Sequence, residues 1–227
     1  TEVNNKISAE EGYSQNWVIA ENLIRVCRGS KVKVESIVFT STQYVIGPEA
    51  DSSMCFSYAP HTTYGESKVV LEKLVRQVTD VNWNIIRPTN VWGPYHQRYS
   101  RELYRLLKLG LFFIPRKALN VSKSYAYVGT VCMQIDRLIN SLSFTNVLYV
   151  GDEPMQQGEW LRMQAEVANG KIKFAPMWIF NVLSTVGDIL GKVSINFPIT
   201  TLRLNNMLCE YKVPMESTFM KIGGGDL

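Results

Sequence analysis

Apolar residues recur along the chain in two forms: at helical spacing, and in short unbroken runs. In QNWVIAENLIRVCR, residues 15–28, apolar positions three or four apart lead into a basic turn, which predicts a helix with Gly29 as its C-terminal cap. The run SIVF, residues 36–39, is short and rich in β-branched side chains, which predicts a buried strand. The pattern therefore begins with a helix followed by a strand.

The same alternation continues to residue 190. Further helices are predicted over residues 64–78, 101–109 (closed by Gly110), 131–142, 159–169 and 177–190, and further strands over residues 83–86, 125–128, 147–150 and 171–174. This alternation is typical of an α/β fold with helices on both faces of a parallel sheet. Ligands of such folds bind beyond the carboxyl ends of the strands, so the loops after Phe39 and Ile86 are where we expect the chemistry.

The composition narrows the class of protein. Of the 227 residues, 46% are hydrophobic and 19% are charged, which is ordinary for a globular protein. The net charge of +4 comes without a dense Lys/Arg block, so we expect no nucleic-acid partner. The cysteines are scattered: Cys27, Cys55, Cys132 and Cys209. With only two histidines beside them, they offer no zinc ligand set and no disulfide framework, so we expect no metal and free thiols.

Two stretches bear on location. The N-terminal TEVNNKISAEEGY has neither the basic nor the apolar region of a signal peptide, and together with the free thiols this indicates the cytoplasm. The most apolar stretch, FAPMWIFNVLSTVGDILGKV, is interrupted by Pro176, Asn181 and Gly187 and is too short to span a membrane. It predicts a core or surface-packed helix; a contact with a membrane surface is the alternative.

Polar residues suited to catalysis follow one predicted strand, open the next predicted helix and end the following strand. Thr42 follows the strand of residues 36–39, and Tyr64-x-x-x-Lys68 opens the next helix. The following strand ends in RPTNVWGP, residues 87–94. A second pair with the same spacing, Tyr104 and Lys108, lies within a helix and follows no strand end, so both residues are expected at the surface.

The Tyr64 and Lys68 pair suits proton transfer. Residues four apart share one helix face, and a nearby ammonium would lower the phenol pKa from its ordinary value of about 10. The phenolate could then take a proton from a sugar hydroxyl as hydride leaves the same carbon. Thr42 would hydrogen-bond to the same hydroxyl oxygen and orient it.

The order VFTST…YGESK…IIRPTNVWGP resembles the extended short-chain dehydrogenase/reductase family, in its nucleotide-sugar epimerase and dehydratase branch, and the resemblance runs from about Gly12 to Leu227. It implies the C-terminal portion of a Rossmann-like sheet with a small mixed α/β substrate-binding subdomain. Residues 1–95 are then the second part of the dinucleotide-binding domain, with the active site. Residues 96–227 are mainly the substrate-binding subdomain, with some segments returning to the sheet.

By this resemblance Tyr64 is the catalytic acid/base, Lys68 binds the nicotinamide ribose, and Thr42 is the hydroxyl partner. The residues implied to bind cofactor are Tyr64, Lys68, Thr40, Pro88 and Val91, and those implied to contact substrate are Thr42, Gln43, Asn90 and Arg203. Asn16 falls where the family has a structural asparagine. Arg203 would hold the nucleotide diphosphate, or else be a surface helix arginine. The implied cofactor is NAD, with NADP left open, and a homodimer is plausible.

The sequence departs from the family pattern at both ends. No Gly-x-x-Gly-x-x-Gly segment occurs, and roughly 70 to 90 residues of the family's N-terminal part are unmatched, judged from βαβ units of about 30 residues. PMESTFMKIGGGDL, residues 214–227, is expected to approach a final helix that does not form. Two explanations remain open: the chain is a fragment or split part of a longer enzyme, or the sequence covers only part of the molecule. An intact protein that evolved without the dinucleotide half is the least expected, because the remaining sheet would expose a long edge. If the whole chain is these 227 residues, we expect it to bind NAD weakly or not at all.

Other departures bear on the reaction. Sugar dehydratases of the family carry an Asp-Glu pair directly after the active-site threonine, where this chain has Gln43 and Tyr44, so dehydration is disfavoured. Lys123 and Thr130 replace an arginine and an aspartate of a further family motif. Three functions remain open: an NAD-dependent epimerase of a nucleotide-linked sugar that works through a keto intermediate, an NAD(P)-dependent reductase or dehydrogenase of a sugar or other carbonyl compound, and a truncated scaffold without activity.

Overall fold

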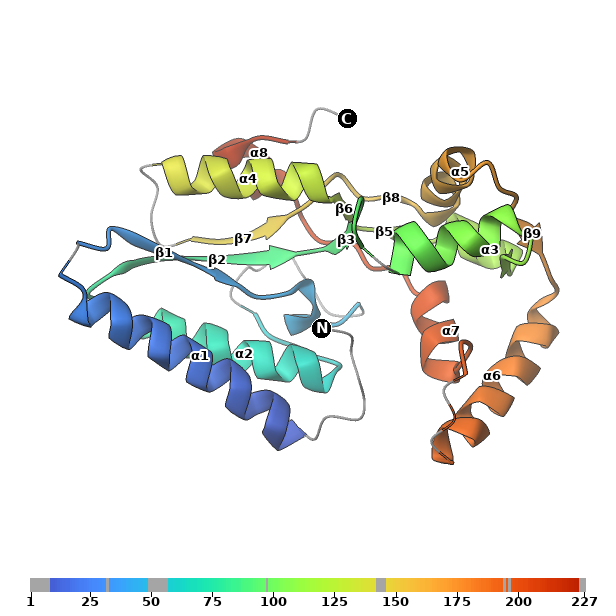
Figure 1. Cartoon of the computed structure of the whole chain (residues 1–227), viewed down its shortest axis with the longest axis horizontal. Helices are drawn as coiled ribbons and strands as arrows, with labels where there is room; N and C mark the ends of the chain where they lie inside the picture. The colour runs from blue at the N-terminus through green and yellow to red at the C-terminus, as the bar shows by residue number, and fades with distance from the viewer. Residues whose placement is uncertain are drawn as a thin grey trace. The chain divides into compact units, whose positions relative to one another are not determined.

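The computed structural model describes residues 9–31, 33–48, 57–96, 98–141, 146–193, 195 and 197–224 (Figure 1). The chain divides into two units, which are described separately. The first comprises Thr1–Val91, Ser124–Glu153 and Lys212–Leu227, and the second comprises Trp92–Lys123 and Pro154–Tyr211.

A three-stranded parallel sheet forms the centre of the first unit. Its strands are β1 (Ser36–Thr40), β2 (Asn82–Pro88) and β7 (Asn146–Val150), in the order β1-β2-β7. Thr40 pairs with Ile86, and Pro88 with Val150, so the three carboxyl ends lie at one edge. The predicted parallel sheet is confirmed, with each of these strands slightly longer than its apolar run. A separate short ladder joins β3 (Asn90–Trp92) to β6 (Tyr125–Tyr127).

Helices cover both faces of this sheet, as predicted. Helices α1 (Ala9–Gly29) and α2 (Thr63–Arg76) lie on one face, and α4 (Val128–Asn140) and α8 (Glu216–Ile222) on the other (Figure 1). Because successive strand residues point to opposite faces, the apolar strands fill two cores.

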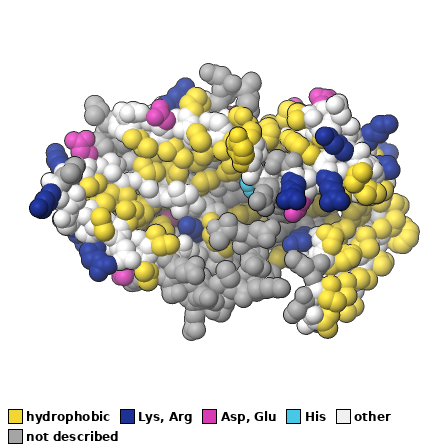
Figure 2. All heavy atoms as spheres, viewed as in Figure 1, with side chains coloured by type: hydrophobic (Ala, Val, Ile, Leu, Met, Phe, Trp, Pro, Cys, Tyr) yellow, Lys and Arg dark blue, Asp and Glu magenta, His cyan; other side chains and the backbone are white. Residues whose placement is uncertain are grey.

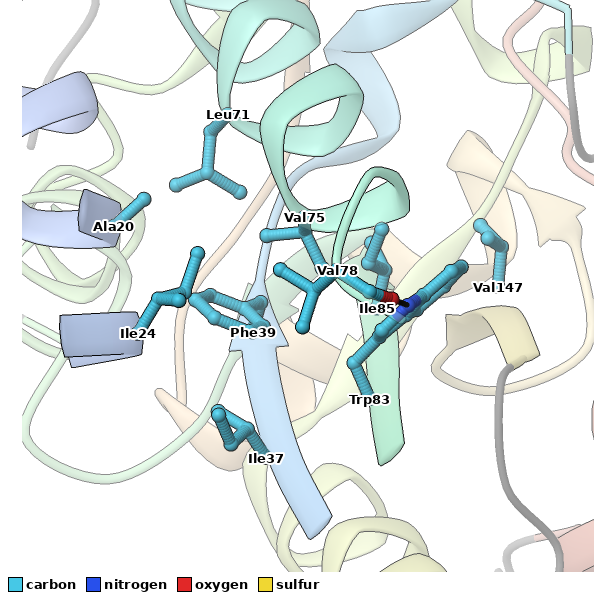
Figure 3. Packing of buried hydrophobic residues seen from close by; sticks show 10 residues of the cluster. All are labelled: Ala20, Ile24, Ile37, Phe39, Leu71, Val75, Val78, Trp83, Ile85 and Val147. Atoms are coloured by element: carbon cyan, nitrogen blue, oxygen red, sulfur yellow. Dashed lines mark hydrogen bonds between the residues drawn. The ribbon is translucent and has the colours of Figure 1, made fainter. Parts of the chain in front are cut away.

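The first core lies between the sheet and the α1–α2 layer. Figure 3 shows Phe39 of β1 between Ile24 of α1 and Val75 of α2. Burying a side chain such as Phe39 stabilises the fold by about 1.5–3 kcal/mol. The second core includes Ile86 and Leu148 from the sheet, which pack with residues of α4 and α8.

The second unit contains mostly helices with short ladders. Its helices are the π-helical turn η2 (Arg98–Leu103), α3 (Tyr104–Lys108), the 3-10 helix η3 (Arg116–Asn120), α5 (Gln157–Val167), α6 (Met177–Lys192) and α7 (Thr201–Leu208). Strands β4 (Phe113–Ile114) and β9 (Lys173–Phe174) pair in parallel, and β5 (Ser122–Lys123) and β8 (Met155–Gln156) antiparallel.

Several sequence expectations need correction. Gly29 is the last helical residue of α1 and is not among the glycines with positive φ, so it is not a left-handed cap, whereas Gly110 has φ of 62° and ends α3 as expected. Residues 216–222 do form a helix, α8, because Ile222 and its neighbours pack on the second core. Helix α7 was not predicted. Tyr104 is half-buried rather than exposed, because its hydroxyl donates to Gln164 Oε1 at 2.9 Å.

The structure also bears on thiols, metals and membranes. Cys27, Cys132 and Cys209 are free thiols, as predicted, and Cys55 lies outside the described residues. Leu142, where the sequence predicted the helix now seen as α4 to end, also lies outside them. Across the described part of the chain, no helix is both long and apolar enough to cross a bilayer. The same residues contain no group of three or more side chains suited to hold a metal ion.

Candidate active site

Thr42 and Tyr64 meet where the end of β1 approaches the start of α2. Thr42 is buried and Tyr64 is half-buried, and the Thr42 side chain lies close enough to the phenol to lower the pKa of Tyr64 through hydrogen bonding. Gly65 allows this approach, because a Cβ at that position would lie 2.1 Å from the backbone oxygen of Tyr44. The close contact of helix and loop thus requires a glycine beside the tyrosine.

The loop after β1 is held in place by its own backbone. The Ser41 N–H donates to Ile86 O at 2.7 Å, which extends the sheet by one residue. The short 3-10 helix η1 (Gln43–Val45) follows, and the Tyr44 N–H donates to Thr42 Oγ1 at 3.3 Å. Thr42 therefore caps η1 while its hydroxyl also reaches Tyr64.

The N-terminus of α2 is fixed in a similar way. Thr62 caps the helix, its Oγ1 accepting the Gly65 N–H at 3.0 Å. Ser67 Oγ donates to the Tyr64 carbonyl at 2.8 Å and accepts from Asn16 Nδ2 at 2.7 Å. Asn16, which the resemblance marked as structural, thus ties α1 to the first turn of α2.

Lys68 lies one turn beyond Tyr64 on the same helix. Its Nζ donates to the Thr40 carbonyl at 3.2 Å and is 5.9 Å from the centroid of the Tyr64 ring. An ammonium has three donors, so this contact orients Lys68 toward the end of β1 without using its full capacity. The structure therefore brings Tyr64, Lys68, Thr42 and Thr40 together at one sheet edge.

The pKa values differ from the expectation in one respect. Burial raises the pKa of Tyr64, the hydrogen bond to Thr42 lowers it, and the neighbouring Tyr44 raises it, with a net rise. Burial also lowers the pKa of Lys68. We expected Lys68 to lower the Tyr64 pKa, but in this structure burial of the phenol is the largest influence on that pKa and raises it.

Two more of the predicted residues meet beside this group. Gln43 Nε2 donates to Asn90 Oδ1 at 3.2 Å, and Asn90 Nδ2 donates to the Ser124 carbonyl at 3.1 Å. The end of β1, the start of β3 and the segment before β6 are thereby linked. Gln43 and Asn90 are thus held in fixed orientations beside Thr42.

The remaining predicted residues are placed as follows. Pro88 is the last residue of β2 and is half-buried, and Val91 packs against the second core. Arg203 belongs to the second unit, in α7, where its Nη1 donates to the carbonyls of Phe197 and Pro198 at 3.2 and 3.1 Å. Its guanidinium therefore braces the segment before its own helix.

Tyr44, an aromatic neighbour of Tyr64, and His61, which lies beside Tyr44, were missed in the sequence. The Tyr44 ring lies 6.4 Å from Tyr64 in an edge-on arrangement, and 5.7 Å from His61. Partial burial lowers the pKa of His61. Tyr44 had been noted only because it replaces one residue of the acidic pair of the sugar dehydratases.

A buried ion pair next to the site was also missed. Glu72 and Arg87 are both fully buried, and Arg87 donates through Nε and Nη2 to the two Glu72 oxygens, each at 2.9 Å. Ser41 Oγ donates to Glu72 Oε1 at 2.6 Å, and Tyr58 donates to Oε2 at 3.1 Å. Arg87 also donates to the Tyr149 hydroxyl at 3.2 Å. Glu72 follows Lys68 by one helical turn, and that spacing was the available signal.

Burial and ion pairing shift the pKa of Glu72 in opposite directions. Burial raises its pKa, but hydrogen bonds and the charge of Arg87, aided by Ser41 and Tyr58, outweigh burial and hold the pKa below its ordinary value. The Arg87 pKa is raised, since its interaction with Glu72 outweighs desolvation. The pair is therefore ionised at neutral pH.

Comparison with known proteins gives a family match. Residues 2–111 match the model of the NAD dependent epimerase/dehydratase family. A search of curated proteins found no significant match.

Solved structures share the fold over nearly the whole chain. A Burkholderia cenocepacia J2315 protein has a TM-score of 0.71 at 17% identity, over 95% of this chain and 66% of its own. The Bordetella bronchiseptica enzyme WbmG, in complex with NAD and UDP, has a TM-score of 0.69 at 15% sequence identity. The match covers 99% of this chain and 65% of WbmG. The UDP-glucose 4-epimerase of Thermus thermophilus, in complex with NAD, has a TM-score of 0.62 at 21% sequence identity. The match covers 93% of this chain and 65% of the epimerase. The chain thus spans just under two thirds of the length of these proteins.

Proposed function

Because the chain belongs to the NAD-dependent epimerase/dehydratase family, we propose that it epimerises a nucleotide-linked sugar, with Tyr64 as the acid/base. The family resemblance seen in the sequence is confirmed by the match over residues 2–111. The observation that carries the proposal is Lys68 one turn beyond Tyr64 on the same helix, with its Nζ 5.9 Å from the Tyr64 ring centroid, and the Thr42 side chain beside the phenol at the end of β1.

These residues divide the proton transfer between them. A sugar hydroxyl bound beside Thr42 and Tyr64 would be oriented by the threonine and would give its proton to the tyrosine oxygen. Tyr64 in its ionised form is the base, and in its neutral form it returns the proton to the keto oxygen. Because burial raises the Tyr64 pKa, the ionised form depends on positive charge supplied nearby.

The donor set fits the nicotinamide-ribose end of NAD. Lys68 gives one hydrogen bond to Thr40 and has further donors for ribose hydroxyls, and Thr40 is exposed at the same strand end. Pro88 and Val91 are proposed to line the nicotinamide side. NAD, when bound, supplies a reversible hydride acceptor and a positive ring. The structures of WbmG and of the Thermus epimerase, both with NAD, support this assignment.

The substrate contacts are proposed on the same basis. Gln43 and Asn90 are hydrogen-bonded to each other beside Thr42, and on this placement both are proposed to contact the sugar. Arg203 is proposed to contact a nucleoside diphosphate, because a guanidinium matches phosphate geometry. The complex of WbmG with UDP supports a diphosphate-linked nucleotide as the carrier. Gln43 and Tyr44 still disfavour dehydration.

Pairing of two copies through α1 is also proposed. In α1 the apolar side chains of Val18, Ile19 and Val26 are at least half exposed, and α1 packs beside the Tyr64 helix. Light scattering should show a dimer, and Ile19→Glu should give a monomer; an unchanged mass for this variant would contradict the pairing. A cytoplasmic location is proposed from the free thiols.

The test of the function is product analysis. Because weak NAD binding is expected of the chain alone, the protein is mixed with a large excess of NAD and with UDP-glucose or UDP-glucuronic acid, and the sugar is followed by NMR while NADH is followed by absorbance. An epimerase forms an epimer without accumulating NADH. Stoichiometric NADH would instead indicate a dehydrogenase, and binding of both ligands without any conversion would indicate a scaffold.

A further inference from the structure

Helix α6 of the second unit exposes a continuous apolar stripe. Trp178, Val182, Val186 and Ile189 recur at spacings of three and four residues, and Val193 and Ile195 follow the helix end; these six side chains are between 40 and 66% exposed. Residues at such spacings share one helix face. Most surface helices turn such a face inward, so this stripe calls for a partner.

The stripe is not the face that packs the helix. Phe180, Ser184 and Gly187 are the buried residues of α6. A Cβ at Gly187 would lie 1.9 Å from the Ile199 carbonyl, so the segment before α7 packs tightly on that side. Asp188, the only acidic residue of α6, accepts the Thr201 N–H at 3.1 Å and is thereby turned toward α7. The buried side chains of α6 and its one acidic side chain, Asp188, thus face other residues of the second unit, and the apolar stripe does not.

A second apolar group with cations adjoins the start of α6. Phe113 of β4 and Phe174 of β9 are exposed, and Phe174 lies three residues before the start of α6 in the chain. The Arg116 guanidinium lies 4.7 Å from the Phe174 ring centroid, and Lys173 Nζ lies 5.6 Å from that of Phe113. Cations therefore lie directly against the exposed rings.

The charge of the second unit has the same sign. Its segments contain twelve Lys and Arg against five Asp and Glu, a net charge of +7, whereas the first unit has twelve against fifteen. Figure 2 shows hydrophobic side chains gathered along α6 and Lys and Arg side chains over neighbouring elements of the same unit. A mild net charge for the whole chain thus conceals a strongly basic unit.

We propose that α6 and the β4–β9 ladder form a surface that binds peripherally to a bilayer containing anionic phospholipid. The stripe would enter the boundary between headgroups and acyl chains, with Trp178 at the depth that tryptophan favours. Lys173 and Arg116 would contact the phosphates. A second copy of the same surface is a poorer occupant, because it would bring two units of the same charge together. The helix would lie on the membrane, as none of the described helices can span it.

The experiment is co-sedimentation of the purified protein with vesicles. Binding is expected to vesicles of phosphatidylcholine with phosphatidylglycerol, to be at least ~10-fold weaker with phosphatidylcholine alone, and to fall at high salt. Val182→Glu should weaken binding at least ~10-fold, whereas the control Val167→Glu, at an even more exposed apolar site on α5, should not. The double change Arg116→Gln with Lys173→Gln should weaken binding roughly 10- to 30-fold, and Arg162→Gln much less.

A second readout concerns Trp178 itself. Its emission should shift to shorter wavelength with anionic vesicles, and Trp178→Phe should remove the shift while most binding remains. Circular dichroism confirms that each variant is folded. The proposal is overturned if the folded protein does not bind anionic vesicles, or if Val182→Glu and Val167→Glu bind alike. It is also overturned if Val182→Glu only abolishes self-association, since α6 would then join copies of the chain.

Discussion

Glu72 and Arg87 form a bidentate ion pair with no solvent exposure, one hydrogen bond away from the loop that carries Thr42. Ser41, the residue before Thr42, donates to Glu72, and Lys68 precedes Glu72 by one turn of α2. The pair therefore links β2, α2 and the end of β1 behind the candidate active site. Its contribution is structural support of that site, and it can be tested separately from the chemistry.

Removing one charge of the pair should destabilise the protein strongly. Glu72→Gln leaves Arg87 buried beside a neutral partner, and breaking such a pair costs about 3–5 kcal/mol. Urea unfolding should show this loss, while Glu66→Gln, at an exposed position on the same helix, should change the unfolding free energy by less than about 0.5 kcal/mol. Similar values for the two variants would mean that the ion pair does not support the fold.

The same pair predicts how stability depends on pH. The Glu72 pKa is lowered in the folded state, so its contribution is complete above the unfolded value of about 4.3 and is lost as the pH falls through the folded pKa. The unfolding free energy should therefore fall with acidification below about pH 4.3, and less steeply in Glu72→Gln. Parallel curves for the two proteins would assign the acid sensitivity to other groups.

Gly65→Ala should displace Tyr64, the proposed acid/base. The new Cβ would meet the Tyr44 backbone oxygen at 2.1 Å, so helix or loop must move, and such overpacking costs about 1–3 kcal/mol. The Thr42–Tyr64 hydrogen bond should be lost with it, together with activity. The control is Gly191→Ala in α6, where no atom lies within 4 Å and a gain of about 0.5–1 kcal/mol is expected. Calorimetry of both variants distinguishes the clash from a general effect of alanine.

The pH profile should reveal the Thr42–Tyr64 hydrogen bond. That bond lowers the Tyr64 pKa, so Thr42→Val should raise it and move the alkaline rise in kcat/KM to higher pH. Loss of rate without a shift in the profile would mean that Thr42 orients substrate but does not tune Tyr64.

Much of this arrangement could be predicted from the sequence, for identifiable reasons. Strands β1 and β7 are unbroken apolar runs, and α2 shows clear helical spacing, so their order predicted that Thr42 and Tyr64 would meet at one sheet edge. Helix α7 was not predicted, and no helix was expected where α8 forms. With eight and seven residues, both helices owe their stability to packing rather than to a long periodic pattern.

The buried charges were harder to foresee. Glu72 and Arg87 stand in segments where a charge ordinarily marks the solvent face, and only the fold shows that they pair in the interior. The rise in the Tyr64 pKa likewise depends on burial under the η1 loop, which no spacing reveals.

The central claim is that Tyr64 is the acid/base, and the second Tyr-x-x-x-Lys pair of the chain provides its control. Epimerisation of a UDP-sugar in the presence of NAD should be measured for Tyr64→Phe and Tyr104→Phe, with folding checked for both. We predict that Tyr64→Phe lowers kcat at least ~100-fold while Tyr104→Phe retains most activity, since the Tyr104 hydroxyl donates a hydrogen bond to Gln164 within the second unit. Unchanged turnover by folded Tyr64→Phe, or an equal loss in both variants, would contradict it.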